Sequence, residues 1–261
     1  MAAALGIAPA TVSLMESATR TPTIEYTTRV LGFLAIQGGE YRRLLELARH
    51  AKDPNWSEPG PHEYPALLVE YERSAATILA WAPKVVPDMV QIPDYARTVL
   101  DSGILTGDEV DQGLMMRLVR RDVALTRATP AAITILLADE VLAHHVGSAG
   151  VLYEQLRYLL TLIQNHQVKV RIVPADPKGR PGLLSPFSLF RFPQRDPVVG
   201  VCQDHLYAFL TEPADVTRCE NAANRLTLRA LNERSSRARL TRALAELDAS
   251  FTRADITVAQ P

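Results

Sequence analysis

The sequence has little of what marks a disulfide-stabilised or zinc-binding protein. It contains only two cysteines, Cys202 and Cys219, in 261 residues. Two thiols cannot build a disulfide framework, and alone they cannot supply the four ligands of a structural zinc site. We therefore interpret them as reduced thiols of a cytoplasmic protein, and we expect neither a metal nor a cofactor.

Long apolar runs and an excess of either charge are also missing. No window approaches twenty uninterrupted apolar residues, so we expect no membrane span. The first residues, MAAALGIAPATV, lack the basic start of a signal peptide. The formal net charge is −1 at pH 7, so any affinity for DNA must come from a local patch. The first fifty residues carry only a weak one, with five arginines against four glutamates.

What is present predicts a small all-helical unit joined to a larger α/β (α+β) domain. Hydrophobic residues make up 47% and charged residues 22%, as in globular proteins. Apolar spacing predicts short helices in a partial helix-turn-helix unit over residues 1–52. Four prolines within 53–65 predict a linker. Residues 66–250 then alternate helices and strands around one sheet, as in an effector-type domain.

Individual elements follow from the same patterns. Apolar runs predict strands over 132–139, 168–174, 187–192 and 197–203. Residues 66–81 are compatible with helix or strand, and we favour a strand for their first half. Helices are predicted over 107–126, over 148–165 and within 214–247. The helix over 148–165 should bury one side, formed by Val151, Leu156, Leu159, Leu160 and Ile163.

The stretch LGIAPATVSLMES, residues 5–17, has the outline of a helix-turn-helix. Gly6 permits a sharp turn, and Leu5, Val12 and Met15 supply an apolar side on which two short helices can pack. With Glu16 and the RTP that follows, the segment resembles the Xre (phage repressor-like) helix-turn-helix, whose second helix lies in the major groove. The resemblance implies DNA contacts from Thr11, Ser13, Arg20 and Thr21.

The rest of the chain resembles the C-terminal domain of many actinobacterial Xre-type regulators. The similarity is carried by WAPKVVPDMVQIPDYARTVL, by DEVLAHHVG, and by GRPGLLSPFSLFRFP followed by LYAFLTEPADV. The two resemblances together extend from Met1 to about Leu231. Because that domain is catalogued as one of unknown function, this part of the resemblance implies an effector-type role and no chemistry.

Several residues depart from the Xre pattern. Ala8 stands where Ser or Thr usually caps the recognition helix, a loss of roughly 1 kcal/mol. Pro9 and Leu14 stand where Gln and Arg commonly reach bases or phosphates, and neither can make a bidentate contact to a base edge. Ala18 replaces the usual terminal glycine, and Thr19 replaces a basic residue.

The helix that normally precedes such a pair would lie before Met1. Two explanations stay open. A start codon assigned too far downstream accounts for the missing helix but not for the substitutions. Decay of the DNA-reading module is the other explanation, although some of these positions vary among working repressors. The expected partner is DNA, bound weakly or no longer bound.

Polar residues follow two of the predicted strands. Asp139 is the last residue of the predicted strand 132–139, and His144 and His145 follow within six residues. Carboxylates and imidazoles at a strand end form a candidate ligand or acid–base site, although an Asp-capped turn with exposed histidines is an alternative. Asp204 and His205 follow the strand 197–203 and are further catalytic candidates. In an extended segment they would face opposite sides, so a polar loop end is again the alternative.

The segment DPKGRPGLLSPF, residues 176–187, predicts a flexible cationic loop between strands. Such a loop can close over an anionic or apolar ligand, although it is equally compatible with an exposed connection. Neither G-x-x-x-x-G-K-[ST] nor G-x-G-x-x-G is present. The run RSSRARLTR, 234–242, can contact phosphates but is more often a solvated helix face. The expected ligand-binding residues are Asp139, His144, Arg180, Leu183, Leu184 and Phe187.

These features predict a cytoplasmic Xre-type transcriptional regulator whose C-terminal domain binds a small-molecule effector. One alternative is an enzyme of specialised metabolism built from a regulator scaffold, in which the same site would turn over a substrate. A protein-interaction partner without either activity is the third. The expected partners are DNA, bound weakly or no longer bound, and a small molecule; a homodimer stays open, and no membrane is expected.

Overall fold

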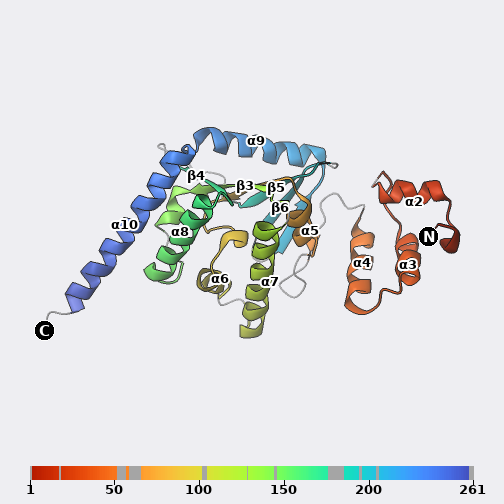
Figure 1. Cartoon of the computed structure of the whole chain (residues 1–261), viewed down its shortest axis with the longest axis horizontal. Coiled ribbons are helices and arrows are strands. Elements are labelled where there is room, and N and C mark those ends of the chain that lie inside the picture. The colour runs from red at the N-terminus through yellow and green to blue at the C-terminus, as the bar shows by residue number, and fades with distance from the viewer. Residues whose placement is uncertain are drawn as a thin grey trace. The chain divides into compact units, whose positions relative to one another are not determined.

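The computed structural model of the chain divides into two compact units, Met1–Trp56 and Ser57–Pro261, each of which is described by itself (Figure 1). The structure describes residues 2–17, 19–51, 57–58, 66–101, 105–127, 129–143, 146–175, 185–193, 196–203 and 206–258.

The first unit consists of helices in its described residues, as expected. They are α1 (Ala2–Leu5), α2 (Pro9–Glu16), α3 (Ile24–Phe33) and α4 (Gly38–His50). Leu5, Val12 and Leu31 form its buried core, with exposed fractions of 7% or less. The expectation that Met15 is buried is wrong, because its side chain is only half-buried. The unit leaves large apolar side chains exposed, namely Leu14, Ile24, Phe33 and Leu34.

The second unit is built on one mixed sheet, which confirms the expected α/β class. Its strands are β1 (Ser57–Glu58), β2 (Thr77–Ala82), β3 (Ala132–Ala138), β4 (Lys169–Val173), β5 (Phe187–Arg191), β6 (Val198–Gln203) and β7 (Leu206–Leu210). Their order is β1-β7-β6-β5-β2-β3-β4. β2 pairs with β3 in parallel, and β3 pairs with β4 in parallel. The other neighbouring strands are antiparallel. β3 is buried on both faces over most of its length, as its apolar run predicts. β2 was not predicted, because only the first half of residues 66–81 was expected to be a strand.

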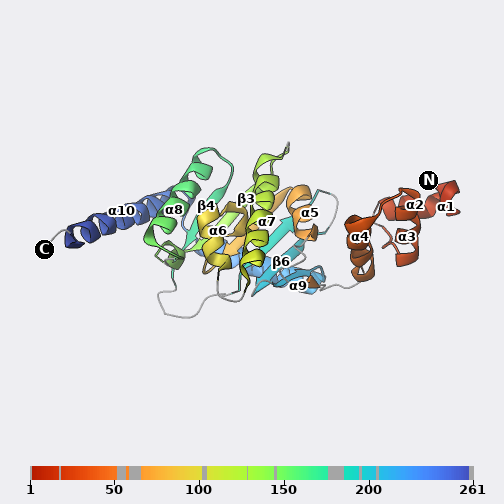
Figure 2. The same ribbon diagram turned by 90° about the horizontal axis from the view of Figure 1, so that it is seen from below.

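Helices cover both faces of this sheet. They are α5 (Ala66–Ser74), η1 (Asp88–Val90), α6 (Pro93–Leu100), α7 (Gly107–Thr126), η2 (Asp139–Leu142), α8 (Ala149–Gln164), α9 (Pro213–Arg229) and α10 (Glu233–Val258). Figures 1 and 2 show α5, α6, α7 and α8 on one face and α9 on the other. α10 packs against α8 and the edge strand β4. α6 and α7 together connect β2 to β3, and α8 connects β3 to β4, which are the crossovers that parallel strands require.

Two sequence-based expectations for this unit are wrong, and the strand β7 was not predicted. Residues 66–74 form helix α5 rather than a strand, because Leu68, Tyr71 and Ala75 bury one helical face at three- and four-residue spacing. A strand that the sequence did not predict, β7, begins at Leu206 and pairs with β6. In α8 the buried face is rotated from the expected one and consists of Leu152, Gln155, Leu156, Leu159 and Leu162.

Candidate functional site

The two helices at the start of the chain are joined by the turn that a helix-turn-helix requires. Gly6 has φ +62°, a left-handed conformation that an L side chain rarely adopts. Ala8 stands at the N-cap of α2 without a side-chain hydrogen bond, and Pro9 follows in the first turn. Leu5 of α1 and Val12 of α2 are both buried. Two short helices therefore meet at a left-handed glycine, and the second begins without a side-chain cap.

The exposed side of α2 is almost free of charge. Pro9, Ala10, Ser13 and Leu14 are exposed, with Leu14 at 41%, and Glu16 is the one charged residue of the helix. A surface of this kind offers a hydroxyl but no cation to a DNA groove. Among the residues that the resemblance assigns to DNA, Ser13 and Arg20 are exposed, whereas Thr11 and Thr21 are half-buried. The backbone N–H of Arg20 donates to the carbonyl oxygen of Leu14 at 3.0 Å, which fixes the chain after α2.

In the second unit, strand topology brings several expected site segments to one edge of the sheet. β3 ends at Ala138, directly before Asp139. Phe187 begins β5 opposite Trp81, near the end of β2, because β2 and β5 are antiparallel. β6 also ends at this edge, since Val201 pairs with Phe187. Strands are spaced about 4.8 Å apart, so β3 and β6, three positions apart in the order, are separated by about 14 Å.

Only part of the expected ligand site lies within the described residues. Phe187 is buried at 6% exposure and belongs to the core. Asp139 is partly exposed and begins η2. The other expected site residues lie outside the described residues: His144, His145, Arg180, Leu183, Leu184, Asp204 and His205.

Asp139 has a cationic partner that the sequence did not indicate. Arg239 of α10 approaches it with two nitrogens, Nε at 2.7 Å from Oδ1 and Nη2 at 3.2 Å from Oδ2. Nη1 of Arg239 also lies 3.7 Å from Oε2 of Glu246. The carboxylate at the end of β3 is thus held by a guanidinium from the C-terminal helix, 100 residues away in sequence.

Charged side chains of α5, η1 and α7 form a largely buried cluster. Glu72 of α5 and Arg120 of α7 are 0% and 3% exposed. Arg120 donates from Nη2 to Glu72 Oε1 at 2.6 Å and from Nε to Oε2 at 3.0 Å. Its Nη1 donates to Asp88 Oδ2 at 2.8 Å. Burial raises the pKa of Glu72 more than the neighbouring Arg120 lowers it.

The polar contacts continue into the irregular segment after β2. Arg117 Nη1 donates to Gln91 Oε1 at 2.7 Å, and Gln91 Nε2 donates to the carbonyl oxygen of Val86 at 2.7 Å. The hydroxyl of Tyr95 accepts from the N–H of Val86 at 3.2 Å, and burial raises the pKa of Tyr95 to about 12. From α8, Gln155 donates to the carbonyl oxygen of Val90 at 2.8 Å. This network holds the segment between β2 and α6 in place.

The sequence predicted a helix over 107–126 but did not indicate that its arginines lie in the interior. The signal was present in their spacing. The buried residues of α7 are Val110, Gly113, Arg117, Arg120 and Ala124. Arg117 and Arg120 therefore fall on the same three- and four-residue stripe as its apolar contacts.

Comparison with known proteins identifies the second unit. The family described as "Domain of unknown function (DUF5753)" matches residues 65–242. The chain belongs to the DUF5753 family. No curated protein matches it. A solved structure of TrmBL2, an archaeal chromatin protein that shows a novel mode of DNA binding, is similar at 12% identity with a TM-score of 0.33. That comparison covers 79% of this chain, which spans 66% of the length of TrmBL2.

The DUF5753 match contains both ionic features described above. Glu72, Asp88, Arg117 and Arg120 lie within it, and so does the pair of Asp139 and Arg239. Helices α1 and α2 lie before it. The described residues of the chain hold no cluster of three or more His, Cys, Asp or Glu side chains suited to a metal ion. Among the helices that the structure describes, none is both long and apolar enough to cross a membrane.

Proposed function

We propose that the chain is an Xre-type transcriptional regulator with weakened DNA binding, whose DUF5753 domain binds a small-molecule effector. The observation that supports this function most is the geometry of residues 2–16. Two short helices meet at Gly6 with φ +62°, and Leu5 and Val12 are buried between the helices of the unit. In a helix-turn-helix the second helix lies in the major groove and presents its exposed side chains to base edges.

The composition of that exposed side sets the kind of binding to expect. Pro9 and Leu14 cannot read a base edge, and α2 carries no basic residue. Phosphate contacts from nearby cations such as Arg20 then supply most of the affinity. Binding should be weak, should fall steeply with salt and should differ little between sequences.

A pair of matched substitutions tests whether α2 docks on DNA. Leu14→Arg on α2 and Leu34→Arg at the end of α3 each replace an exposed leucine by a cation in the same unit, at 41% and 53% exposure. We expect Leu14→Arg to strengthen binding of the full chain to duplex DNA by at least tenfold more than Leu34→Arg, by fluorescence anisotropy, since a base contact is worth about 1–3 kcal/mol. Equal gains from both variants would show that charge alone matters and that α2 does not enter a groove.

For the effector, we place the site at the edge where β2, β3 and β4 end. Ligands of α/β folds collect at the carboxyl ends of parallel strands, where loops meet. Asp139 lies at this edge, and the segment from β4 to β5 leaves and returns there. On this proposal Arg180 holds an anionic group of the effector, Leu183 and Leu184 add apolar contact, and His144 hydrogen-bonds it.

The effector is tested by incubating the protein with extract of the cells that produce it and comparing mass spectra before and after. A bound compound recovered unchanged supports a sensor, whereas a new product identifies an enzyme instead. Arg180→Ala and His144→Ala should each reduce the amount of compound retained. If both variants retain it as the unsubstituted chain does, the site is wrongly placed.

A further inference from the structure

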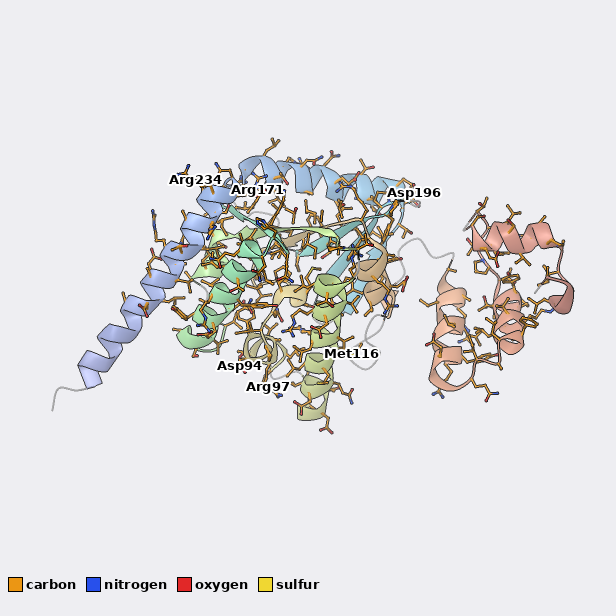
Figure 3. The ribbon with its side chains drawn as sticks, in the orientation of Figure 1. Asp94, Arg97, Met116, Arg171, Asp196 and Arg234 are labelled. Atoms are coloured by element: carbon orange, nitrogen blue, oxygen red, sulfur yellow. The ribbon has the colours of Figure 1, made fainter. Side chains whose placement is uncertain are left out.

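We propose that the corner where α9 meets α10 is a second surface for the DNA backbone, separate from the helix-turn-helix. The proposal rests on the proposed DNA-binding function and assigns a phosphate-binding role to the DUF5753 domain. The surface, here called the basic elbow, consists of five exposed arginines at the end of α9 and the start of α10: Arg225, Arg229, Arg234, Arg237 and Arg242. Figure 3 shows Arg234 at this corner, beside Arg171 of β4.

The charge of this segment is strongly one-sided, although the whole chain has a net charge of only −1. Residues 225–242 contain six arginines and a single acidic residue, Glu233. Glu233 forms an ion pair with Lys169 of β4, whose Nζ lies 3.3 Å from Glu233 Oε1. The sixth arginine, Arg239, turns inward to Asp139 and is not part of the elbow. A local cationic patch of this kind is what DNA affinity requires when the overall field is neutral.

The three arginines of α10 lie on its solvent side. The opposite side is buried through Ser236, Leu240 and Ala243. Arg234 and Arg242 are eight residues apart, which is about 12 Å along a helix. One strand of DNA carries a phosphate about every 3.4 Å along its axis, so this length matches three to four phosphates. Between Arg234 and Arg242 the other exposed residues are small, which permits close approach of a backbone: Ser235, Ala238 and Thr241.

The elbow is also rigidly attached to the sheet. Arg171 of β4 donates to the carbonyl oxygens of Ala230 and Leu231, both at 2.9 Å. Leu231 N–H donates to the carbonyl oxygen of Ile172, and Ile172 N–H donates to Ser236 Oγ at 3.0 Å. These bonds fix the connection between the helices on the edge strand. The arginines therefore start from a scaffold that needs little ordering on binding.

The helix dipole favours Arg229 in the last turn of α9, but helix stability does not explain where Arg234 and Arg237 stand. Arg234 and Arg237 lie in the first turns of α10, where the helix dipole disfavours cations. α7 shows the favourable arrangement, with Asp108 and Glu109 in its first turn. Cations placed against the dipole add to the positive field of the helix start, which favours an anionic partner.

The test measures the salt dependence of DNA binding by the full chain. Arg234→Gln, Arg237→Gln and Arg242→Gln are combined in one variant. The control combines Arg73→Gln, Arg157→Gln and Arg218→Gln, which removes the same charge from three arginines exposed by 61%, 64% and 77% elsewhere on the domain. Each lost phosphate contact lowers the log–log salt slope by about 0.9. The elbow variant should therefore lose about 2.7 from the slope, whereas the control variant should keep the slope of the unsubstituted chain.

Expressed as affinity, the unsubstituted chain should weaken about 40-fold more than the elbow variant between about 50 and about 200 mM salt. Equal losses in both variants, or no loss in the elbow variant, would overturn the basic elbow. The comparison of Leu14→Arg with Leu34→Arg would still decide the helix-turn-helix, so the two proposals fail separately. If the elbow variant loses binding to vesicles of anionic phospholipid but not to DNA, the partner is a membrane surface and the proposal is wrong.

Discussion

Replacing Arg120 by methionine should destabilise the DUF5753 domain far more than the loss of an ordinary ion pair. Arg120 is 3% exposed and holds Glu72, which is 0% exposed, with N–O distances down to 2.6 Å. Methionine replaces the aliphatic part of arginine but carries no charge, so the variant leaves the Glu72 carboxylate in the interior without its guanidinium. Breaking a buried pair in this way costs about 3–5 kcal/mol. That is a large part of the about 5–15 kcal/mol by which a domain is usually stable.

The chain supplies a matched control at its surface. Arg157 and Glu154 of α8 also lie 2.6 Å apart, but their side chains are 64% and 47% exposed. Arg157→Met removes the same chemistry in water, where such a pair contributes about 1 kcal/mol or less. Glu72→Leu combined with Arg120→Met removes both buried charges and should recover much of the stability lost in Arg120→Met. Urea unfolding followed by circular dichroism measures all four proteins.

The cost of Arg120→Met should depend on pH with a definite sign. Burial raises the pKa of Glu72 in the folded protein, and Arg120 opposes this. A carboxyl with a raised folded pKa adds stability below its unfolded pKa of about 4.3, and this stability is lost as pH rises through the folded pKa. Without Arg120 the folded pKa rises further, so the variant should be closest to the unsubstituted chain near pH 4.5 and furthest from it near pH 7. Equal costs for Arg120→Met and Arg157→Met, or a cost of Arg120→Met that grows as pH falls, would refute this reasoning.

Two further substitutions follow from the contacts. Tyr95→Phe leaves the N–H of Val86 without its acceptor and should cost about 1–3 kcal/mol in urea unfolding at pH 7. The pKa of Tyr95 is about 12 in the folded protein and about 10 in the unfolded chain, so the unsubstituted chain loses stability above pH 10. The stability difference between the two proteins should therefore narrow above pH 10, and a constant difference would contradict the burial of the hydroxyl. Ala8→Ser supplies the missing cap of α2 and should slow amide hydrogen exchange in that helix by an amount equivalent to about 0.5–1 kcal/mol. Ala10→Ser, in the first turn of the same helix, is the control and should give no such protection. Equal protection from both substitutions would show that capping is not the cause.

Elements with strong local patterns were predictable from sequence. β3 was recognised because a continuous apolar run is typical of a buried parallel strand. β4 was recognised because VKVRIV is rich in β-branched residues. α7 begins with the acids expected of a helix start, Asp108 and Glu109. α5 was missed because Leu67, Leu68 and Val69 form an apolar run that either structure accepts. Its helical form depends on what the sheet and α7 bury, which local sequence does not contain.

The interior polar contacts were out of reach for a physical reason. Arg120 is separated from Glu72 by 48 residues and Arg239 from Asp139 by 100 residues. A single sequence gives no measure of which distant groups meet, and arginine is usually exposed. The sharp turn between α1 and α2 was predictable because it is local: Gly6 takes a left-handed conformation that glycine adopts readily.

The most direct test of the central claim is a titration of the full, unsubstituted chain against two unrelated DNA duplexes of about 30 base pairs, with fluorescence anisotropy between about 50 and about 200 mM salt. A weakened helix-turn-helix regulator should bind both duplexes at the lowest salt with affinities within a few-fold of each other, and it should lose binding steeply as salt rises. If neither duplex is bound at about 50 mM salt, the proposal that the chain binds DNA is wrong. Tight, salt-resistant binding to one duplex alone would contradict the interpretation of α2 as a helix without base readout.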